Sequence, residues 1–170
     1  MSTPVASPIR FAIAPISPEF VQRVRATLRD DFGRTVRVSV AEGGEPLRDQ
    51  LRRAAPGERI ILGGYQAVAL PSEFAAIGPV FVSADGADAP PPIRDALPAG
   101  YFNRTFALRG YDALDRIAHS TLVEPERAPD EFAAMLARPG VAYLHAHFAG
   151  HGCFAARIDR SESDQAARSG

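Results

Sequence analysis

The chain has 170 residues, of which 46% are hydrophobic and 23% are charged, close to the average for globular domains. Nineteen basic residues, all of them Arg, face twenty acidic ones, and the net charge of -1 argues against a nucleic-acid binder that relies on bulk positive charge. The single Cys excludes an internal disulfide framework and a multi-Cys zinc site, and the lack of Lys excludes Schiff-base and Walker lysines.

The chain carries neither of the two sequence signals for a membrane or secreted protein. No stretch approaches the roughly 20 apolar residues that span a bilayer. Residues 1–8 lack the charged start and apolar core of a signal peptide. We therefore expect a cytoplasmic protein with a reduced thiol and no membrane partner. Its organisation is expected to be one domain over residues 9–160, with flexible tails at 1–8 and 161–170.

The first 40 residues predict a strand, a helix and a second strand. Residues 9–13 alternate apolar and other side chains, as a half-buried strand does. Ser17 is a typical N-cap, and Pro18 suits the first helical position, so a helix is expected from there to Gly33. Residues 36–40 alternate Val with polar side chains and predict the next strand.

The middle of the chain is rich in turn residues. Residues 47–51 predict a short helix that stops before Pro56-Gly57. Short apolar runs predict strands at 59–62 and 79–83, with a tight turn at Gly63-Gly64 between them. Residues 85–98 contain four Pro and predict a loop.

The last third predicts four strands and one helix. The strands are expected at 104–109, 114–123, 141–148 and 153–158, and the helix is expected from Pro129 to Pro139-Gly140. This mixed order favours the α+β class, with a largely antiparallel sheet, two main helices and a C-terminal His-rich hairpin.

Three of the four His and the only Cys lie within residues 145–153. Pairing Phe148 with Cys153 across the hairpin would place the sulfur on the side opposite the histidines. Pairing His147 with Cys153 instead segregates polar from apolar side chains, and the pattern favours this second register. The predicted polar face then consists of Tyr143, His145, His147, Cys153 and Arg157.

This predicted face leaves three interpretations open. In the first, His145, His147 and Cys153, with His151 from the turn, hold zinc or another divalent metal. In the second, His147 activates Cys153 as a catalytic nucleophile. In the third, the hairpin is a non-catalytic structural or interaction module. No cofactor is fixed by the sequence, and enzymatic activity stays undecided.

Arginines near the same face predict a site for a small anionic ligand. Arg157 and Arg109, with Tyr143 and Asp112, could hold such a group, since Arg binds carboxylates and phosphates through two parallel hydrogen bonds. The alternative for Asp112 is a turn in which its carboxylate caps local backbone. Arg52-Arg53 is expected on a solvated face. The expected partner is a small anionic molecule, with no nucleic acid, and a homodimer stays open.

The run at residues 141–160, with its His-x-His and Gly-Cys-Phe-Ala-Ala-Arg segments, resembles the end of a family of small bacterial proteins called domain of unknown function 1203. Further similar pieces occur in the same order at 36–40, 56–62, 78–82 and 108–112, so the resemblance extends from about residue 34 to 160.

Three positions depart from the family pattern: Val36 stands where Cys is frequent, Phe148 where Asn is frequent, and His151 where Pro or another residue is usual. The first difference removes a second thiol, and the other two affect the ligand set of the turn. The resemblance implies the extent of the domain and no reaction, so we expect an uncharacterised protein that binds an anionic ligand or a metal on the hairpin face.

Overall fold

The computed structural model of the chain describes residues 9–86 and 88–161. The predicted tails lie outside the described residues, except for Ser161. Ser161 is buried, and its N–H donates to the carbonyl of Arg10, so the ordered domain extends at least to this residue.

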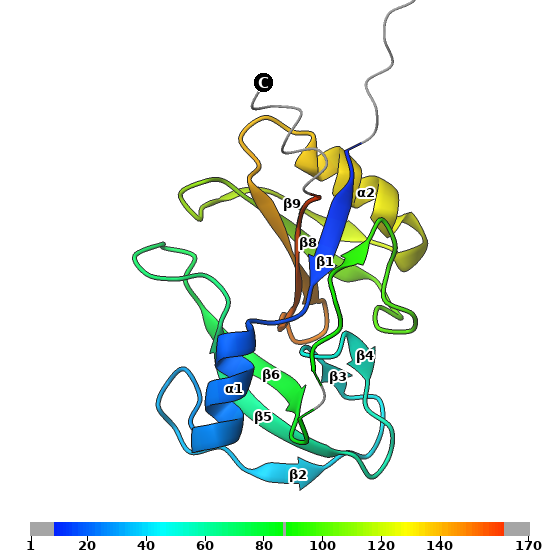
Figure 1. The fold of residues 1–170 in the computed structure, drawn as a ribbon. Helices are drawn as coiled ribbons and strands as arrows, with labels where there is room; N and C mark the ends of the chain where they lie inside the picture. The colour runs from blue at the N-terminus through cyan, green and yellow to red at the C-terminus, as the bar shows by residue number, and fades with distance from the viewer. Residues whose placement is uncertain (1–8, 87, 162–170) are drawn as a thin grey trace, which may run out of the picture.

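The first of two sheets has six strands, all paired antiparallel (Figure 1). Its strands in spatial order are β7 (Ile93–Arg94), β1 (Phe11–Ala14), β11 (Phe154–Arg160), β10 (Tyr143–Phe148), β8 (Phe106–Tyr111) and β9 (Ile117–Val123). The first and the last described strands, β1 and β11, therefore pair with each other inside this sheet.

The second sheet has five strands, in the order β2 (Val38–Val40), β5 (Arg59–Gln66), β6 (Ile77–Ser83), β3 (Pro46–Leu47) and β4 (Arg52–Arg53). Only the pairing of β3 with β6 is parallel. The α+β class, largely antiparallel strands and two α-helices are confirmed. The division into two sheets was not predicted, since the sequence pattern suggested one.

The first helix, α1 (Pro18–Thr27), begins as the sequence predicts. The Oγ of Ser17 accepts a hydrogen bond from the N–H of Phe20, which is the expected N-cap. The predicted end at Gly33 is wrong, because Leu28 adopts a left-handed conformation (φ 51°) and terminates the helix five residues earlier. The second helix, α2 (Ala128–Leu136), follows one turn of 3-10 helix (Pro125–Arg127) and lies where it was predicted.

Two predictions for the middle of the chain are wrong. Residues 47–51 form the end of β3 and the turn that leads to β4 rather than a short helix, and Leu51 has a positive φ of 50° that an α-helix does not accept. Gly63 and Gly64 lie inside β5 and not in a turn. A Cβ on Gly64 would lie 2.7 Å from the ring of Phe32, so the missing side chain allows close packing there.

The core is divided between the two sheets. α2 packs on one face of the six-stranded sheet, and α1 packs against β5 and β6 of the other sheet (Figure 1). Phe154, at the start of β11, belongs to the cluster around α1, so this strand contacts both parts of the molecule. No helix among the described residues is long and apolar enough to span a membrane.

Candidate functional site

The pairing of β10 with β11 differs from the predicted register. His145 lies opposite Arg157, and His147 lies opposite Phe154 rather than Cys153. A β-bulge between these pairs places one extra residue, Ala155, in β11. The prediction assumed one polar and one apolar face, whereas nearly all of β10 is buried on both faces. Alternation of residue types cannot fix a register when both faces are buried.

His145 lies in an aromatic environment and is 1% exposed. Its ring contacts those of Tyr111, Tyr143 and Phe154 at centroid distances of 4.9 to 5.1 Å. Burial, with added repulsion from His147, Arg157 and Arg109, lowers the pKa of His145 to about 3. This histidine is therefore neutral at physiological pH.

His147 is also buried and neutral, since burial lowers its pKa to about 4. Its Nδ1 donates to the carbonyl of Gly152 at 2.9 Å, so Nε2 is the unprotonated ring nitrogen. His147 Nε2 and His145 Nδ1 are both buried without a hydrogen-bond partner among the described residues. His147 thus holds the turn that precedes Cys153.

The residues predicted to bind a metal do not form a ligand set. Nowhere in residues 9–86 and 88–161 do three His, Cys, Asp or Glu side chains come close enough to share an ion. His151 and Cys153 line a cavity, whereas His145 and His147 are buried beside Phe154. The positive charges of Arg109 and Arg157 near His145 further disfavour a cation there.

The predicted anion-binding residues on this face are engaged with protein groups. Tyr143 donates from its hydroxyl to Asp115 at 2.6 Å, and the guanidinium of Arg157 covers its ring at 3.9 Å. Arg157 also forms an ion pair with Asp159 at 2.9 Å. Tyr143, His145 and Arg157 share a face as predicted, but their polar groups already have partners on that face or lie buried.

The second predicted pair, Arg109 and Asp112, is not brought together as a ligand site. Arg109 lies opposite His145 in the β8–β10 register. Asp112 accepts from the backbone N–H groups of Leu114 and Arg116 and from the Arg116 side chain. The alternative interpretation, in which Asp112 caps a turn, is therefore confirmed.

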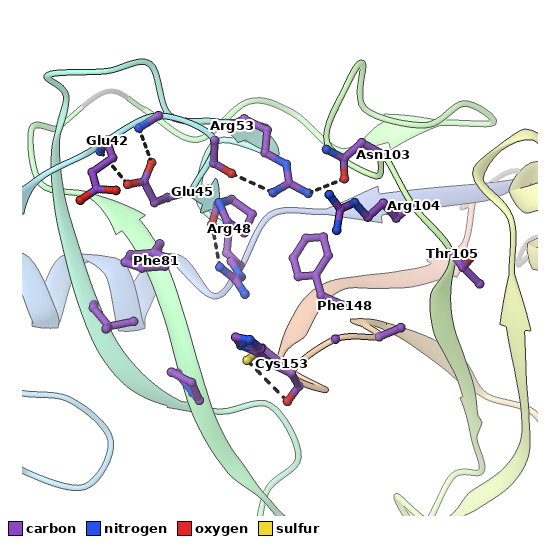
Figure 2. Close-up of a pocket in the computed structure, with 18 residues that line it drawn as sticks. Glu42, Glu45, Arg48, Arg53, Phe81, Asn103, Arg104, Thr105, Phe148 and Cys153 are labelled. Carbon is purple, nitrogen blue, oxygen red and sulfur yellow. Dashed lines mark hydrogen bonds between the residues drawn. The ribbon is translucent and has the colours of Figure 1, made fainter.

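A cavity among the described residues lies elsewhere, between the two sheets. It has a volume of about 780 Å³, which is in the range of small-molecule sites. Its walls come from the β3–β4 region, from residues 103–105 before β8, and from the turn between β10 and β11. Figure 2 shows Arg48, Arg53 and Arg104 gathered around the ring of Phe148 in this cavity. We call these four residues the arginine cluster.

Arg48 is the most buried cation of the arginine cluster, with 3% of the residue exposed. Its Nε donates to the carbonyl of Phe154 at 2.9 Å, and its Nη1 donates to the carbonyl of Pro46 at 2.7 Å. Burial lowers the pKa of Arg48, and the nearby Tyr101 and Cys153 side chains oppose this effect. No carboxylate pairs with Arg48 among the described residues, so its charge is not neutralised by a counter-ion.

Arg53 and Phe148 extend the arginine cluster. Arg53 donates from Nε and Nη2 to the carbonyl of Tyr101 and from Nη2 to Asn103. The guanidinium carbons of Arg48 and Arg53 lie 5.1 and 5.2 Å from the centroid of the Phe148 ring, within the range of a cation–π contact. The ring therefore fixes the spacing of two guanidinium groups.

Acidic residues occupy one side of the cavity. Glu45 accepts from the backbone N–H groups of Glu42 and Gly43. Burial opposes the ionised form of Glu45, but these hydrogen bonds outweigh it and lower its pKa. Gly43 has a φ of 113°, which side-chain-bearing residues rarely adopt, so glycine is needed for this loop. The cavity thus has an arginine-rich part and a carboxylate-bearing loop.

Cys153 is half-buried and lines the same cavity. Its Sγ lies 3.9 Å from the carbonyl of His151, and its own carbonyl accepts the N–H of Phe148. No hydrogen bond joins Cys153 to His147 in the part of the chain described. The sulfur therefore lies in the cavity that Arg48 also lines, and not beside the predicted histidine base.

Sequence reasoning missed Arg48, Arg53, Arg104 and Phe148 as a group. Arg52-Arg53 was expected on a solvated face, which holds for Arg52, an exposed partner of Glu58, but is wrong for Arg53. The available signal was the number of Arg residues near Gly43-Gly44, but residues up to 100 positions apart form this cluster. Only the fold brings them together.

Comparison with known proteins yields one family. The family described as Protein of unknown function (DUF1203) matches residues 44–160. This range contains the arginine cluster, Cys153 and both buried histidines, and it begins about ten residues later than the resemblance suggested. Neither a curated protein nor a solved structure gives a significant match. The chain belongs to the DUF1203 family of proteins of unknown function.

Proposed function

We propose that the protein binds a small anionic molecule, one that carries phosphate or carboxylate groups, in the cavity at the arginine cluster. The observation that carries this proposal is the buried guanidinium of Arg48, whose hydrogen bonds within the described residues go to neutral carbonyls. A buried charge is costly unless an opposite charge pairs with it. A bound anion supplies that charge.

An ion pair close to Arg48 in the structure shows how a buried charge is usually neutralised within a protein. Arg25 forms an ion pair at 2.8 Å with Asp49, whose side chain is 1% exposed. Arg48 is the neighbour of Asp49 in sequence, yet it forms no such pair with a described residue. The charge of Arg25 is therefore neutralised by a carboxylate of the protein. The charge of Arg48 is not, and in this proposal the ligand neutralises it.

The volume and the lining of the cavity favour a small ligand that has an anionic part and a flat or apolar part. Arg104 lines the cavity near Phe148 (Figure 2) and is exposed, so it can contact an anionic group that enters from solvent. Phe148, Phe81 and Leu62 give the lining apolar surface. Glu42 and Glu45 disfavour a negative group near their loop and so orient the ligand toward the arginines.

In this proposal the anionic ligand lies at the cavity rather than on the Tyr143–His145–Arg157 face. The C-terminal His-rich hairpin contributes Phe148 and Cys153 to the cavity wall. A metal is not part of the proposal, because the described histidines and Cys153 do not converge.

Titration calorimetry with inorganic pyrophosphate and citrate as probes tests the proposal, with the diamine putrescine as the oppositely charged comparison. We expect both anions to bind and putrescine not to bind. Arg104→Ala should weaken anion binding about 5- to 50-fold, as expected for loss of one charged hydrogen bond.

Arg127→Ala is the matched control, because Arg127 is an exposed arginine outside the cavity, 3.9 Å from Glu131. Its anion affinity should equal that of the wild type. Equal affinities in Arg104→Ala and Arg127→Ala would contradict binding at the arginine cluster, as would absence of binding to either anion.

A further inference from the structure

The thiol of Cys153 opens into the same cavity as the arginine cluster. Cys153 is the only Cys of the chain and is half-buried, so a small molecule can reach its sulfur while a large one is hindered. Figure 2 shows the sulfur in the cavity, on the side of Phe148 where Arg48 lies. Arg48 and Cys153 line the same cavity, and the side chain of Cys153 is one of the groups that raise the pKa of Arg48 against the effect of burial.

The unneutralised Arg48 is an observation independent of the thiol. Only 3% of Arg48 is exposed to solvent, and its hydrogen-bond partners among the described residues are backbone carbonyls. An anion that pairs with Arg48 is therefore placed beside Cys153. A reactant recognised by this cavity must combine negative charge with a group that a thiol can attack.

We propose that Cys153 undergoes thiol–disulfide exchange with a small anionic disulfide held by the arginine cluster. This inference rests on the proposed function, because it assumes that the cluster binds anions. It adds the chemical class of the reactant and assigns a covalent role to the thiol.

The exchange balances without any further oxidant. Cys153 loses its proton to solvent, and the thiolate attacks one sulfur of the disulfide. A new S–S bond forms to Cys153 while the original S–S bond breaks, and the leaving thiolate carries away the electron pair. Cys153 is oxidised to a mixed disulfide, and half of the small disulfide is reduced to a thiol. A second thiol reverses the step in the same way.

His147 acts in this scheme through the backbone and not as a base. Its Nδ1 holds the carbonyl of Gly152, and the N–H of Gly152 donates to the carbonyl of Phe148. These bonds fix the turn on both sides of Gly152 and so place Cys153 at the cavity wall. His147 is a positioning residue.

Rates of mixed-disulfide formation, measured by intact-protein mass spectrometry, test the inference. The reactants are oxidised glutathione, which is anionic, 2-hydroxyethyl disulfide, which is neutral, and cystamine, which is cationic. N-acetylcysteine amide serves as the reference thiol, and Cys153→Ser gives the background. For each thiol we take the rate with oxidised glutathione divided by the rate with cystamine. We expect this ratio to be about tenfold or more higher for Cys153 than for the reference thiol, because the positive charge of the cavity attracts the anion.

Arg104→Ala should reduce this ratio at least about threefold, and Arg127→Ala, outside the cavity, should leave it unchanged. The neutral disulfide shows whether the thiol stays accessible in each variant. A ratio equal to that of the reference thiol, or one insensitive to Arg104→Ala, would overturn the inference.

Pyrophosphate binding to Cys153→Ser separates this inference from the proposed function. Binding to this variant, together with a disulfide ratio like that of the reference thiol, rejects the thiol reaction and retains the anion site. If neither the wild type nor Cys153→Ser binds pyrophosphate, both the anion site and the inference that rests on it are rejected.

Discussion

Arg48 donates from Nε to the carbonyl of Phe154, a residue 106 positions later in the chain, across a buried distance of 2.9 Å. The contact joins the turn between β3 and β4 to the start of β11, and therefore joins the two sheets. The backbone of Arg48 also bonds to Phe81 in β6 and to Ile16 between β1 and α1. One residue thus lines the cavity and connects three parts of the fold.

Replacement of Arg48 by Met should lower the free energy of unfolding by about 2–3 kcal/mol, because it leaves the carbonyls of Phe154 and Pro46 without their charged donor. Removal of an uncompensated buried charge offsets part of this loss, so the effect is smaller than for breaking a buried ion pair. Urea unfolding followed by far-UV circular dichroism measures it, since the chain has no Trp. Arg127→Ala should change the value by less than about 0.5 kcal/mol. A wild-type midpoint for Arg48→Met would contradict this account.

Asp49 supports the loop that carries Arg48. Its carboxylate accepts from the N–H and the hydroxyl of Ser83 and from Arg25, and its side chain is 1% exposed. Asp49→Asn keeps the shape but removes the charge that pairs with Arg25. We expect a loss of about 2–4 kcal/mol in urea unfolding.

Ser83→Ala is the graded comparison for Asp49→Asn. It removes a hydroxyl that donates to Asp49 and accepts from Arg25, and it leaves the Arg25–Asp49 ion pair in place, so its loss should be smaller, about 1–2 kcal/mol. Equal losses in the two variants would show that the ion pair contributes nothing to the stability of this loop.

Phe148 separates the guanidinium groups of Arg48 and Arg53 and packs against the ring of Tyr101 at 5.5 Å. Phe148→Leu keeps an apolar side chain but removes the π face. We expect a loss of about 1–2 kcal/mol in the free energy of unfolding, from two cation–π contacts. Phe148→Tyr keeps the ring and should retain most of the stability. A Leu variant that is as stable as the Tyr variant would argue against a role for the ring face.

Local signals were sufficient for many of the elements. Ser17 and Pro18 mark the start of α1, and the structure confirms it, because an N-cap depends on residues that are adjacent in sequence. The strands around the histidines were also found, since alternation and turn residues are local. The end of α1 was not predicted correctly. Leu28 adopts a left-handed conformation there, and this conformation is expected of Gly rather than of Leu.

The candidate site could not be predicted because it depends on long-range pairing. The bulge at Ala155 turns Phe154 toward His145 and His147 and leaves Cys153 at the cavity, and burial on both faces removes the pattern that would reveal it. The sequence identified Cys153 as a residue of interest, but it assigned it to the wrong neighbours.

The buried histidines should make the protein less stable as the pH falls below neutrality. The folded-state pKa values of His145 and His147 are about 3 and about 4, whereas an unfolded histidine titrates near 6.5. Between these values the unfolded state binds more protons, so stability is full above about pH 6.5 and falls as the pH decreases toward 4. Each histidine should remove about 1–2 kcal/mol between pH 7 and pH 5.

Urea unfolding at pH 7, 6 and 5 measures this dependence. In the folded protein Glu58 stays ionised over this range, because its hydrogen bonds to Arg52 lower its pKa to about 2. His145→Phe should fit among Tyr111, Tyr143 and Phe154 and should reduce the slope of stability against pH by about half. His119→Asn, which changes a histidine on β9 that contacts Arg138, is the matched control and should keep the full slope. A slope unchanged in His145→Phe would show that His145 is already protonated in the folded protein at pH 5 or is not buried as described.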